Sequence, residues 1–104
     1  MEERVKKIAR ELKRKIEKKY EIKDIKIFGS SVRGDQREDS DIDIFIHLDQ
    51  SDRRIEEDLF DISYDIELEY DCLIDLIIID DEDIKGRIGN APIYENILSE
   101  GASI

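Results

Sequence analysis

The chain has 104 residues, 39% of them apolar and 43% charged, and a formal net charge of −11 at pH 7. This length fits a single domain spanning residues 1–104, and the longest apolar run, Leu76–Ile79, is far shorter than the roughly 20 residues of a membrane span. The charged N-terminus argues against a signal peptide, and the lone Cys72 excludes an internal disulfide. We therefore expect a soluble cytoplasmic protein with no membrane partner.

The charges are unevenly distributed along the chain. Residues 1–20 carry nine basic and four acidic side chains, whereas residues 35–83 carry three basic and twenty acidic ones. An acidic body argues against direct nucleic-acid binding, which needs a broad basic surface, and suits divalent cations or a basic protein partner. The high charge content, the absence of Trp and the small number of side-chain amides are typical of proteins from hot environments, and they predict a thermophilic source.

The first predicted element is an amphipathic helix over about residues 2–20. Its apolar residues recur at steps of three and four: Val5, Ile8, Leu12, Ile16 and Tyr20. A short strand, Ile25–Phe28, follows and ends at the turn-forming run Gly29–Asp35. The next segment, Asp41–His47, alternates with period two, so the isoleucines of this strand face one side while Asp41 and Asp43 share the other.

The second half of the chain repeats the helix and strand pattern. Ser51 or Asp52 can cap a second long helix that runs to about residue 70. The segment Leu73–Ile79 is apolar on both faces, which predicts a central buried strand, and the acidic residues 80–83 end it. A last short helix is expected over residues 93–99. This order predicts an α/β (α+β) fold in which helices flank a small mixed sheet.

Asp75 is the anomaly in the third strand. An ionised carboxylate in a buried strand costs several kcal/mol unless a cation compensates it, and basic residues are scarce nearby. A bound metal is the simplest compensation, since Asp41, Asp43 and Asp75 would supply the hard oxygen ligands that Mg²⁺ prefers. The chain contains 15 aspartates, however, so an Asp-x-Asp pair on its own also fits an acidic domain without an active site.

The turn before the aspartates favours a phosphate site. Small residues at Gly29 and Ser30 let backbone N–H groups and a hydroxyl approach phosphate, and Arg33 and Arg37 in the connecting loop could neutralise further phosphate charge. A phosphate cradle would then adjoin the candidate metal ligands.

The chain therefore contains Gly29-Ser30, ten intervening residues, and Asp41-Ile42-Asp43, within the segment FGSSVRGDQREDSDIDIFI. With Asp75 on the next strand, this pattern resembles the minimal nucleotidyltransferases of the polymerase-β-like nucleotidyltransferase superfamily, and the resemblance covers essentially the whole chain. It implies the polymerase-β-like nucleotidyltransferase fold. It also implies that Asp41 and Asp43 bind two Mg²⁺ ions and that Asp75 completes the metal site and helps to deprotonate the acceptor. Gly29 and Ser30 would hold the triphosphate of ATP.

The resemblance also implies a partner. The catalytic signature ends at Asp75 and 29 residues follow it, so we expect another protein to supply the acceptor. The minimal nucleotidyltransferases that this chain resembles are antitoxins that adenylylate a tyrosine of a HEPN-domain ribonuclease toxin. The resemblance therefore implies a protein adenylyltransferase that acts in a hetero-oligomer. Two alternatives stay open at this point: a non-catalytic antitoxin that neutralises its partner by binding, and a nucleotidyltransferase that acts on a small hydroxyl compound.

Overall fold

The computed structural model describes residues 3–29, 32 and 41–104, and it begins with the predicted amphipathic helix. Helix α1 spans Glu3–Glu17, and Tyr20 packs against the core from the turn that follows. The helix buries one stripe at steps of three and four, as expected: Val5, Ile8, Ala9, Leu12 and Ile16. The sequence prediction was therefore right in place and too long by a few residues at the C-terminal end.

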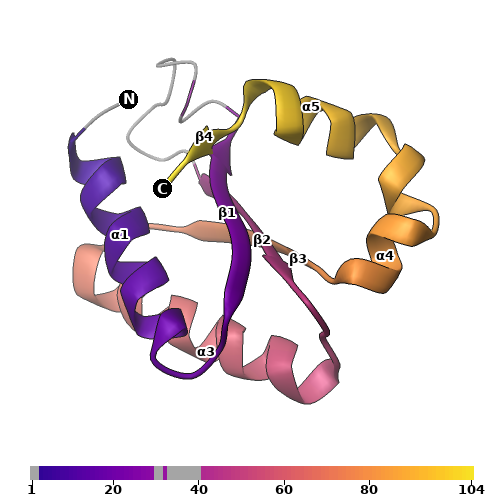
Figure 1. Cartoon of the computed structure of the whole chain (residues 1–104). Coiled ribbons are helices and arrows are strands. Elements are labelled where there is room, and N and C mark those ends of the chain that lie inside the picture. Colours follow the sequence, from indigo (N-terminus) through magenta and orange to yellow (C-terminus); the bar gives the residue numbers. More distant parts are fainter. Residues whose placement is uncertain (1–2, 30–31, 33–40) are drawn as a thin grey trace.

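Four strands form one mixed sheet in the order β3-β2-β1-β4 (Figure 1). The strands are β1 Ile22–Phe28, β2 Ile42–Leu48, β3 Ile74–Ile79 and β4 Ala102–Ser103. Strand β1 is antiparallel to both β2 and β4, whereas β2 and β3 are parallel. Parallel neighbours require a crossover connection, and the helix between them provides it.

That connection is α3, which spans Arg53–Tyr70. Asp52 is its N-cap, and the Ile55 backbone N–H donates to Asp52 Oδ1 over 2.9 Å. The helix ends at Asp71, whose backbone is left-handed with φ 51°. Within the described part of the chain, no helix is long and apolar enough to cross a membrane.

The acidic run after β3 starts a helix that the sequence analysis did not anticipate. Helix α4 spans Asp81–Lys85, and a reciprocal capping box holds its first turn: the Asp83 N–H donates to Asp80 Oδ1 over 2.9 Å, and the Asp80 N–H donates to Asp83 Oδ2 over 3.0 Å. Carboxylates near a helix N-terminus stabilise the helix because they interact favourably with its partial positive charge. A 3₁₀ turn, Ile88–Asn90, and helix α5, Pro92–Glu100, complete the chain before β4.

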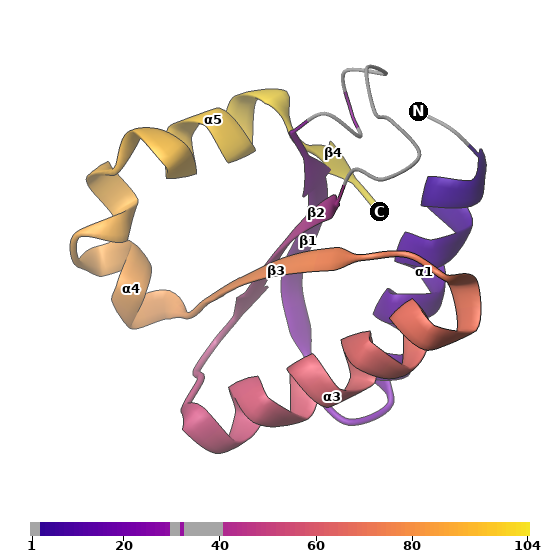
Figure 2. The same ribbon diagram turned by 180° about the vertical axis from the view of Figure 1, so that it is seen from behind.

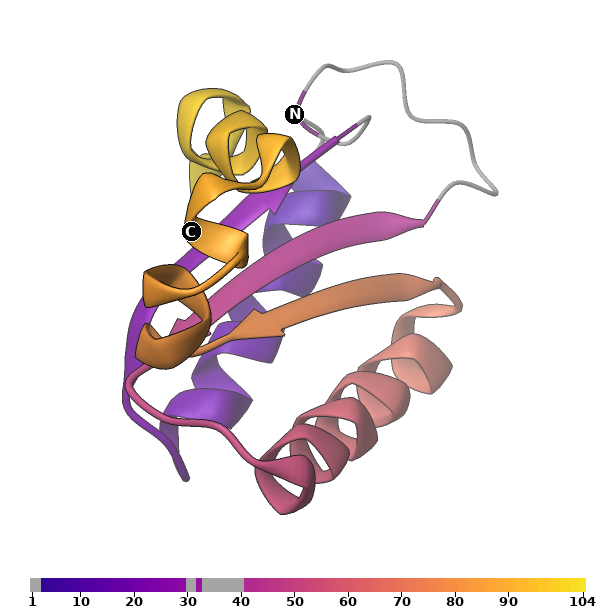
Figure 3. The ribbon, with the colours of Figure 1, turned by 90° about the vertical axis from the view of Figure 1, so that its right-hand side faces the viewer.

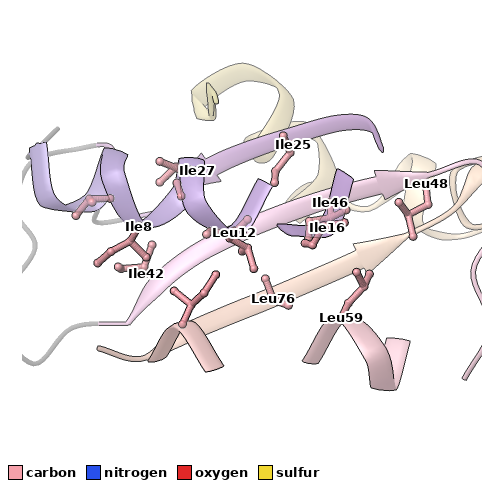
Figure 4. Close-up of a cluster of buried hydrophobic side chains, with 14 residues drawn as sticks. Ile8, Leu12, Ile16, Ile25, Ile27, Ile42, Ile46, Leu48, Leu59 and Leu76 are labelled. Carbon is pink, nitrogen blue, oxygen red and sulfur yellow. The ribbon is translucent and has the colours of Figure 1, made fainter. Parts of the chain in front are cut away.

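The helices cover opposite faces of the sheet (Figure 3). Helices α1 and α3 pack on the face that carries Ile42, Ile44, Ile46 and Leu48. Figure 4 shows Ile42, Ile46 and Leu48 in the main core, together with side chains of α1 and α3. On the other face, α4 and α5 enclose a smaller cluster built on Phe45, which also contains Ile79 and Ile97. The predicted alternation of β2 is thus confirmed.

One expectation for the sheet is wrong. Strand β3 is not central but lies at an edge, next to β2 alone (Figure 2). Its residues are apolar on both sides because helices cover both faces of the sheet there: Leu76 joins the main core, and Ile77 and Ile79 join the smaller cluster. Apolar side chains on both faces of a strand indicate that both faces are covered by other elements. They do not indicate whether the strand has one neighbouring strand or two.

The segregated charges meet within the fold. Helix α1 and the turn after it are basic and lie beside the acidic α3. Lys15 Nζ lies 3.8 Å from Glu69 Oε2, and Lys19 Nζ lies 3.3 Å from Asp58 Oδ1. Part of the charge asymmetry seen in the sequence is therefore neutralised between two neighbouring helices.

Candidate active site

The site begins where β1 ends. Phe28, the last residue of β1, pairs with Asp43 of β2, so Gly29 lies beside that aspartate. The backbone of Gly29 is left-handed, with φ +73°, a conformation that favours glycine. A Cβ atom at this position would also overlap Asp43 Oδ2. Two features therefore favour glycine at this position: the left-handed backbone and the close approach of the Asp43 carboxylate.

Asp43 and Asp75 lie next to each other on the adjacent strands β2 and β3. They are direct partners in the parallel register of β2 and β3, where neighbouring strands lie about 4.8 Å apart. Both belong to the sheet face that carries Phe45 and Ile77, because side chains two residues apart share a face. Asp43 is half-buried and Asp75 is exposed. The pairing places two carboxylates side by side at the start of both strands.

Asp41 stands at the same end of the sheet. It is exposed and comes immediately before β2, two residues ahead of Asp43. The backbone N–H of Ile42 donates to the Leu73 carbonyl oxygen over 2.9 Å, which fixes the start of β2 against the start of β3. Figure 3 shows these two strand starts side by side, away from α4. All three predicted catalytic aspartates therefore lie at one end of the sheet.

The three carboxylates do not form a closed ligand set in this structure. Across the described ranges, no three Asp, Glu, His or Cys side chains are gathered into a group that could hold an ion. In those same ranges no lysine or arginine forms an ion pair with Asp41 or Asp75. The structure thus brings Asp43 and Asp75 together in register and places Asp41 next to them.

The sequence argument for a buried Asp75 is wrong. Its side chain is exposed because it lies near the start of an edge strand, before the part of β3 that α4 and α5 cover. No desolvation penalty therefore requires a cation at this position. The support for a metal site comes instead from the register of two carboxylates on adjacent strands.

The other predicted phosphate contacts lie outside the described residues. These are Ser30, Arg33 and Arg37. What is described of the segment is a turn: the Val32 N–H donates to the Gly29 carbonyl oxygen over 3.2 Å, and the Val32 side chain packs against the main core. Val32 therefore lies close to Gly29 and against the main core.

Leu73 is a residue at the site that the sequence analysis did not single out. It directly precedes β3 and is 58% exposed, although the sequence analysis placed it inside a buried strand. By alternation it shares a side with Asp75. The predicted end of the second helix at about residue 70 was the available signal that Leu73 lies close to a strand start, and in the structure α3 ends at Tyr70.

His47 lies at the opposite end of β2 from the aspartates. Its Nε2 atom is 2.8 Å from Asp81 Oδ1, and Lys23 Nζ donates to Asp81 Oδ2 over 2.6 Å. The hydrogen bonds from Lys23 and, next, His47 lower the pKa of the Asp81 carboxyl. This cluster ties α4 to β1 and β2, so the structure gives His47 a role in packing.

Comparison with known proteins shows what the chain is similar to. A family model described as the nucleotidyltransferase domain matches residues 5–102. A Methanocaldococcus jannaschii protein that carries the name putative protein adenylyltransferase is 39% identical over 94 residues, which cover 89% of this chain and 87% of that protein. A second protein of that name and organism is 45% identical over 47 residues, covering 45% of this chain and 47% of its own length. The chain spans about half the length of the first relatives it matches.

A solved structure supports the same fold. A chain in the crystal structure of a toxin-antitoxin with AMP-PNP has a TM-score of 0.61 to this chain at 19% identity, covering 96% of this chain and 68% of that one. The predicted α/β nucleotidyltransferase fold is thereby confirmed. Since the family model covers nearly the whole length and the 39% identical relative covers most of both chains, the chain belongs to the nucleotidyltransferase domain family.

Proposed function

We propose that this chain is a protein adenylyltransferase antitoxin, which transfers AMP from ATP to a tyrosine of a HEPN-domain ribonuclease and thereby silences it. The observation that carries the proposal is the pairing of Asp43 with Asp75 on adjacent parallel strands, beside the left-handed Gly29. Family membership supports nucleotidyl transfer, and the relatives named as adenylyltransferases support a protein acceptor. The similar fold within a toxin-antitoxin with AMP-PNP supports a toxin partner and an adenine nucleotide.

The donor set suits Mg²⁺. Carboxylate oxygens are the ligands that this ion prefers, and it commonly keeps water and substrate phosphates as its other ligands. Asp43 is held in place by its strand and by Gly29, whereas Asp41 and Asp75 are exposed and their side chains are free to change rotamer. Asp41 and Asp43 would hold two ions, and Asp75 would complete the site. When bound, Mg²⁺ neutralises negative charge on the triphosphate and on the attacking oxygen.

The remaining roles belong to this chain's own residues. The tyrosine oxygen attacks the α-phosphorus of ATP, the bond from that phosphorus to the bridging oxygen breaks, and pyrophosphate leaves. Asp75, which is more exposed than its register partner Asp43, is placed to accept the phenolic proton. The turn at Gly29 brings the backbone close to the phosphates, and Ser30, Arg33 and Arg37 would bind the triphosphate.

The decisive experiment is intact mass spectrometry of the HEPN-domain partner after incubation with this chain and Mg-ATP. We expect a gain of one or more whole AMP units on the partner, and none without Mg²⁺. The variants Asp41→Asn, Asp43→Asn and Asp75→Asn should each lower the transfer rate by about 100-fold or more. At Asp75 this is the usual loss when a positioned acid-base group is removed, and at Asp41 and Asp43 it follows from the loss of a metal ligand that supports several kcal/mol of charge stabilisation. Asp71→Asn is the matched control, because it makes the same chemical change four residues before Asp75 at a left-handed position that Asn tolerates.

A second result would redirect the proposal. If the partner binds tightly and is neutralised without a gain in mass, the chain acts by binding alone, and the aspartate variants should neutralise as well as the parent. If AMP is instead recovered on a small hydroxyl compound, the acceptor assigned here is wrong.

The proposal includes a cellular setting. An acidic chain of this composition would act in the cytoplasm, where ATP and a ribonuclease target are both present. The richness in charge and the scarcity of side-chain amides support a heat-adapted source.

A further inference from the structure

Helix α3 carries a second apolar row on its outer side. Its buried residues, Leu59, Ser63 and Ile66, face the sheet. Phe60, Tyr64 and Leu68 are nevertheless 50%, 58% and 66% exposed, and no other described residue of the helix with a large apolar side chain is as exposed. They recur every four residues, so they lie above one another on a single side of the helix. We call these three residues the outer row.

Carboxylates border the outer row. Residues 55–71 contain eight acidic residues and no basic one. Glu57, Asp61 and Asp65 have the same spacing of four and therefore form a parallel row next to it. The outer row is thus a strip of two aromatic rings and a leucine with an acidic margin.

The exposed rings indicate a contact surface. Exposed single apolar residues are ordinary, but three large ones aligned along one helix form a contiguous patch, and patches with a polar rim mark protein interfaces. Tyrosine is also enriched among the residues that dominate binding energy. A helix surface of this kind fits a partner element that presents its own apolar row.

The margin decides what kind of partner fits. A second copy docked about a two-fold axis would bring one acidic margin against the other, and like charges across an interface are unfavourable. A partner with lysines or arginines around an apolar centre would instead pair with Asp61 and Asp65, whereas Glu57 already forms an ion pair with Arg53 of the same helix over 3.1 Å. The charge therefore favours a basic protein over self-association.

The outer row also leads to the candidate active site. Helix α3 ends at Tyr70, and four residues later β3 begins, with the exposed Leu73 between them. Figure 3 shows the end of α3 beside the start of β3 and close to the start of β2. Asp41 directly precedes β2, and Asp75 is the second residue of β3. A protein bound along α3 would therefore reach the β3 edge of the sheet at the end where the three aspartates lie. Its acceptor residue would pass around the start of β3 to the opposite face of the sheet, on which Asp43 and Asp75 lie.

We propose that the outer row is the docking surface for a protein with a basic-rimmed apolar face, and that this protein is the one whose tyrosine the aspartates modify. The second half of this statement rests on the proposed function, whereas the docking surface itself does not. Docking through α3 would hold the acceptor near the site in a chain whose catalytic residues all lie between Gly29 and Asp75.

The test measures binding of the purified HEPN-domain partner by isothermal titration calorimetry. The double variant Tyr64→Lys, Leu68→Lys changes only exposed positions, and circular dichroism checks that it folds. We expect it to bind the partner at least about 30-fold more weakly, the loss typical of a hot spot. Arg10→Glu, an exposed charge reversal on α1, is the control and should bind as the parent does. Asp43→Asn should also bind normally, although its AMP transfer falls by about 100-fold or more.

Each outcome bears on the proposal. Unchanged affinity of the double variant for the partner overturns the proposal. A dimer of the parent chain in light scattering also overturns it if the double variant is a monomer. Normal docking through the outer row without AMP transfer overturns the proposed function and leaves the docking surface standing. If the HEPN-domain protein does not bind, the probe becomes a synthetic amphipathic helix with a leucine row bordered by lysines, compared with one bordered by glutamates. NMR shifts centred on the outer row with the lysine peptide alone support the proposal, and any other pattern overturns it.

Discussion

At Gly29 the backbone is left-handed and lies against the carboxylate of Asp43, so a methyl group there meets two obstacles. We predict that Gly29→Ala destabilises the chain by about 1–2 kcal/mol, the cost of a left-handed conformation for an ordinary residue. It should also displace Asp43 and reduce AMP transfer more than the loss of stability alone explains. Urea unfolding and the mass assay, both run at a temperature where the variant is folded, measure the two effects.

Gly86→Ala is the matched control for this prediction. Gly86 has a negative φ of −93°, and a Cβ there would make an ordinary contact of 3.4 Å with the Glu82 carbonyl oxygen. Its stability should change by no more than about 0.5 kcal/mol. Equal losses at both glycines would show that Gly29 is no more constrained than a surface turn.

The individual site residues were predictable to different degrees. Asp41 and Asp43 could be placed on one strand face because alternation is a local property of the backbone. The exposure of Asp75 could not be predicted, since it depends on where α4 and α5 stop covering β3. The contact between Gly29 and Asp43 was equally hidden, because it depends on the pairing register of β1 and β2.

At the scale of elements, the cap of α4 links stability to pH. The backbone N–H of Asp83 and, next, that of Ser51 hydrogen-bond the Asp80 carboxylate and lower its pKa. A carboxyl whose pKa is lower in the folded state stabilises the fold at pH values above its unfolded pKa, and this contribution is lost as the pH falls through the folded pKa.

Asp80→Asn keeps an acceptor at the cap but removes the titrating group. We predict that the parent chain is more stable than this variant at pH 7 and that the difference shrinks as the pH falls below about 4, the ordinary pKa of an aspartate. Urea unfolding of both chains at several pH values measures the difference. A difference that stays constant down to pH 2 would contradict this account of the cap.

The order of the main elements followed from periodicity, whereas two short elements did not. Both long helices and β2 carry period signals that extend over several residues, whereas β3 was predicted from a continuous apolar run and β1 from a short apolar segment before a turn. Helix α4 has five residues and β4 has two, too few for a period to show. The edge position of β3 was missed because a sequence reports which faces are apolar and does not report which strand lies next to which.

At the scale of the whole molecule, composition and ion pairs predict high thermal stability. Oppositely charged side chains join α1 to α3, and a His-Asp-Lys cluster joins α4 to the sheet. Such pairs contribute more at high temperature, where desolvating charge costs less. We predict a melting midpoint above about 65 °C, the upper end for mesophilic domains, by differential scanning calorimetry. A midpoint near 50 °C would contradict the inferred thermophilic source.

Helix α3 makes up most of the connection from β2 to β3, the strands that carry Asp43 and Asp75. Its outer row faces away from the sheet, while its inner side packs on the strands whose register sets the two carboxylates against each other. A substitution in the outer row that shifts α3 would therefore also shift the packing of its inner side on the strands. Partner choice and active-site geometry would then evolve under a shared constraint, with each compatible pair of chains changing together.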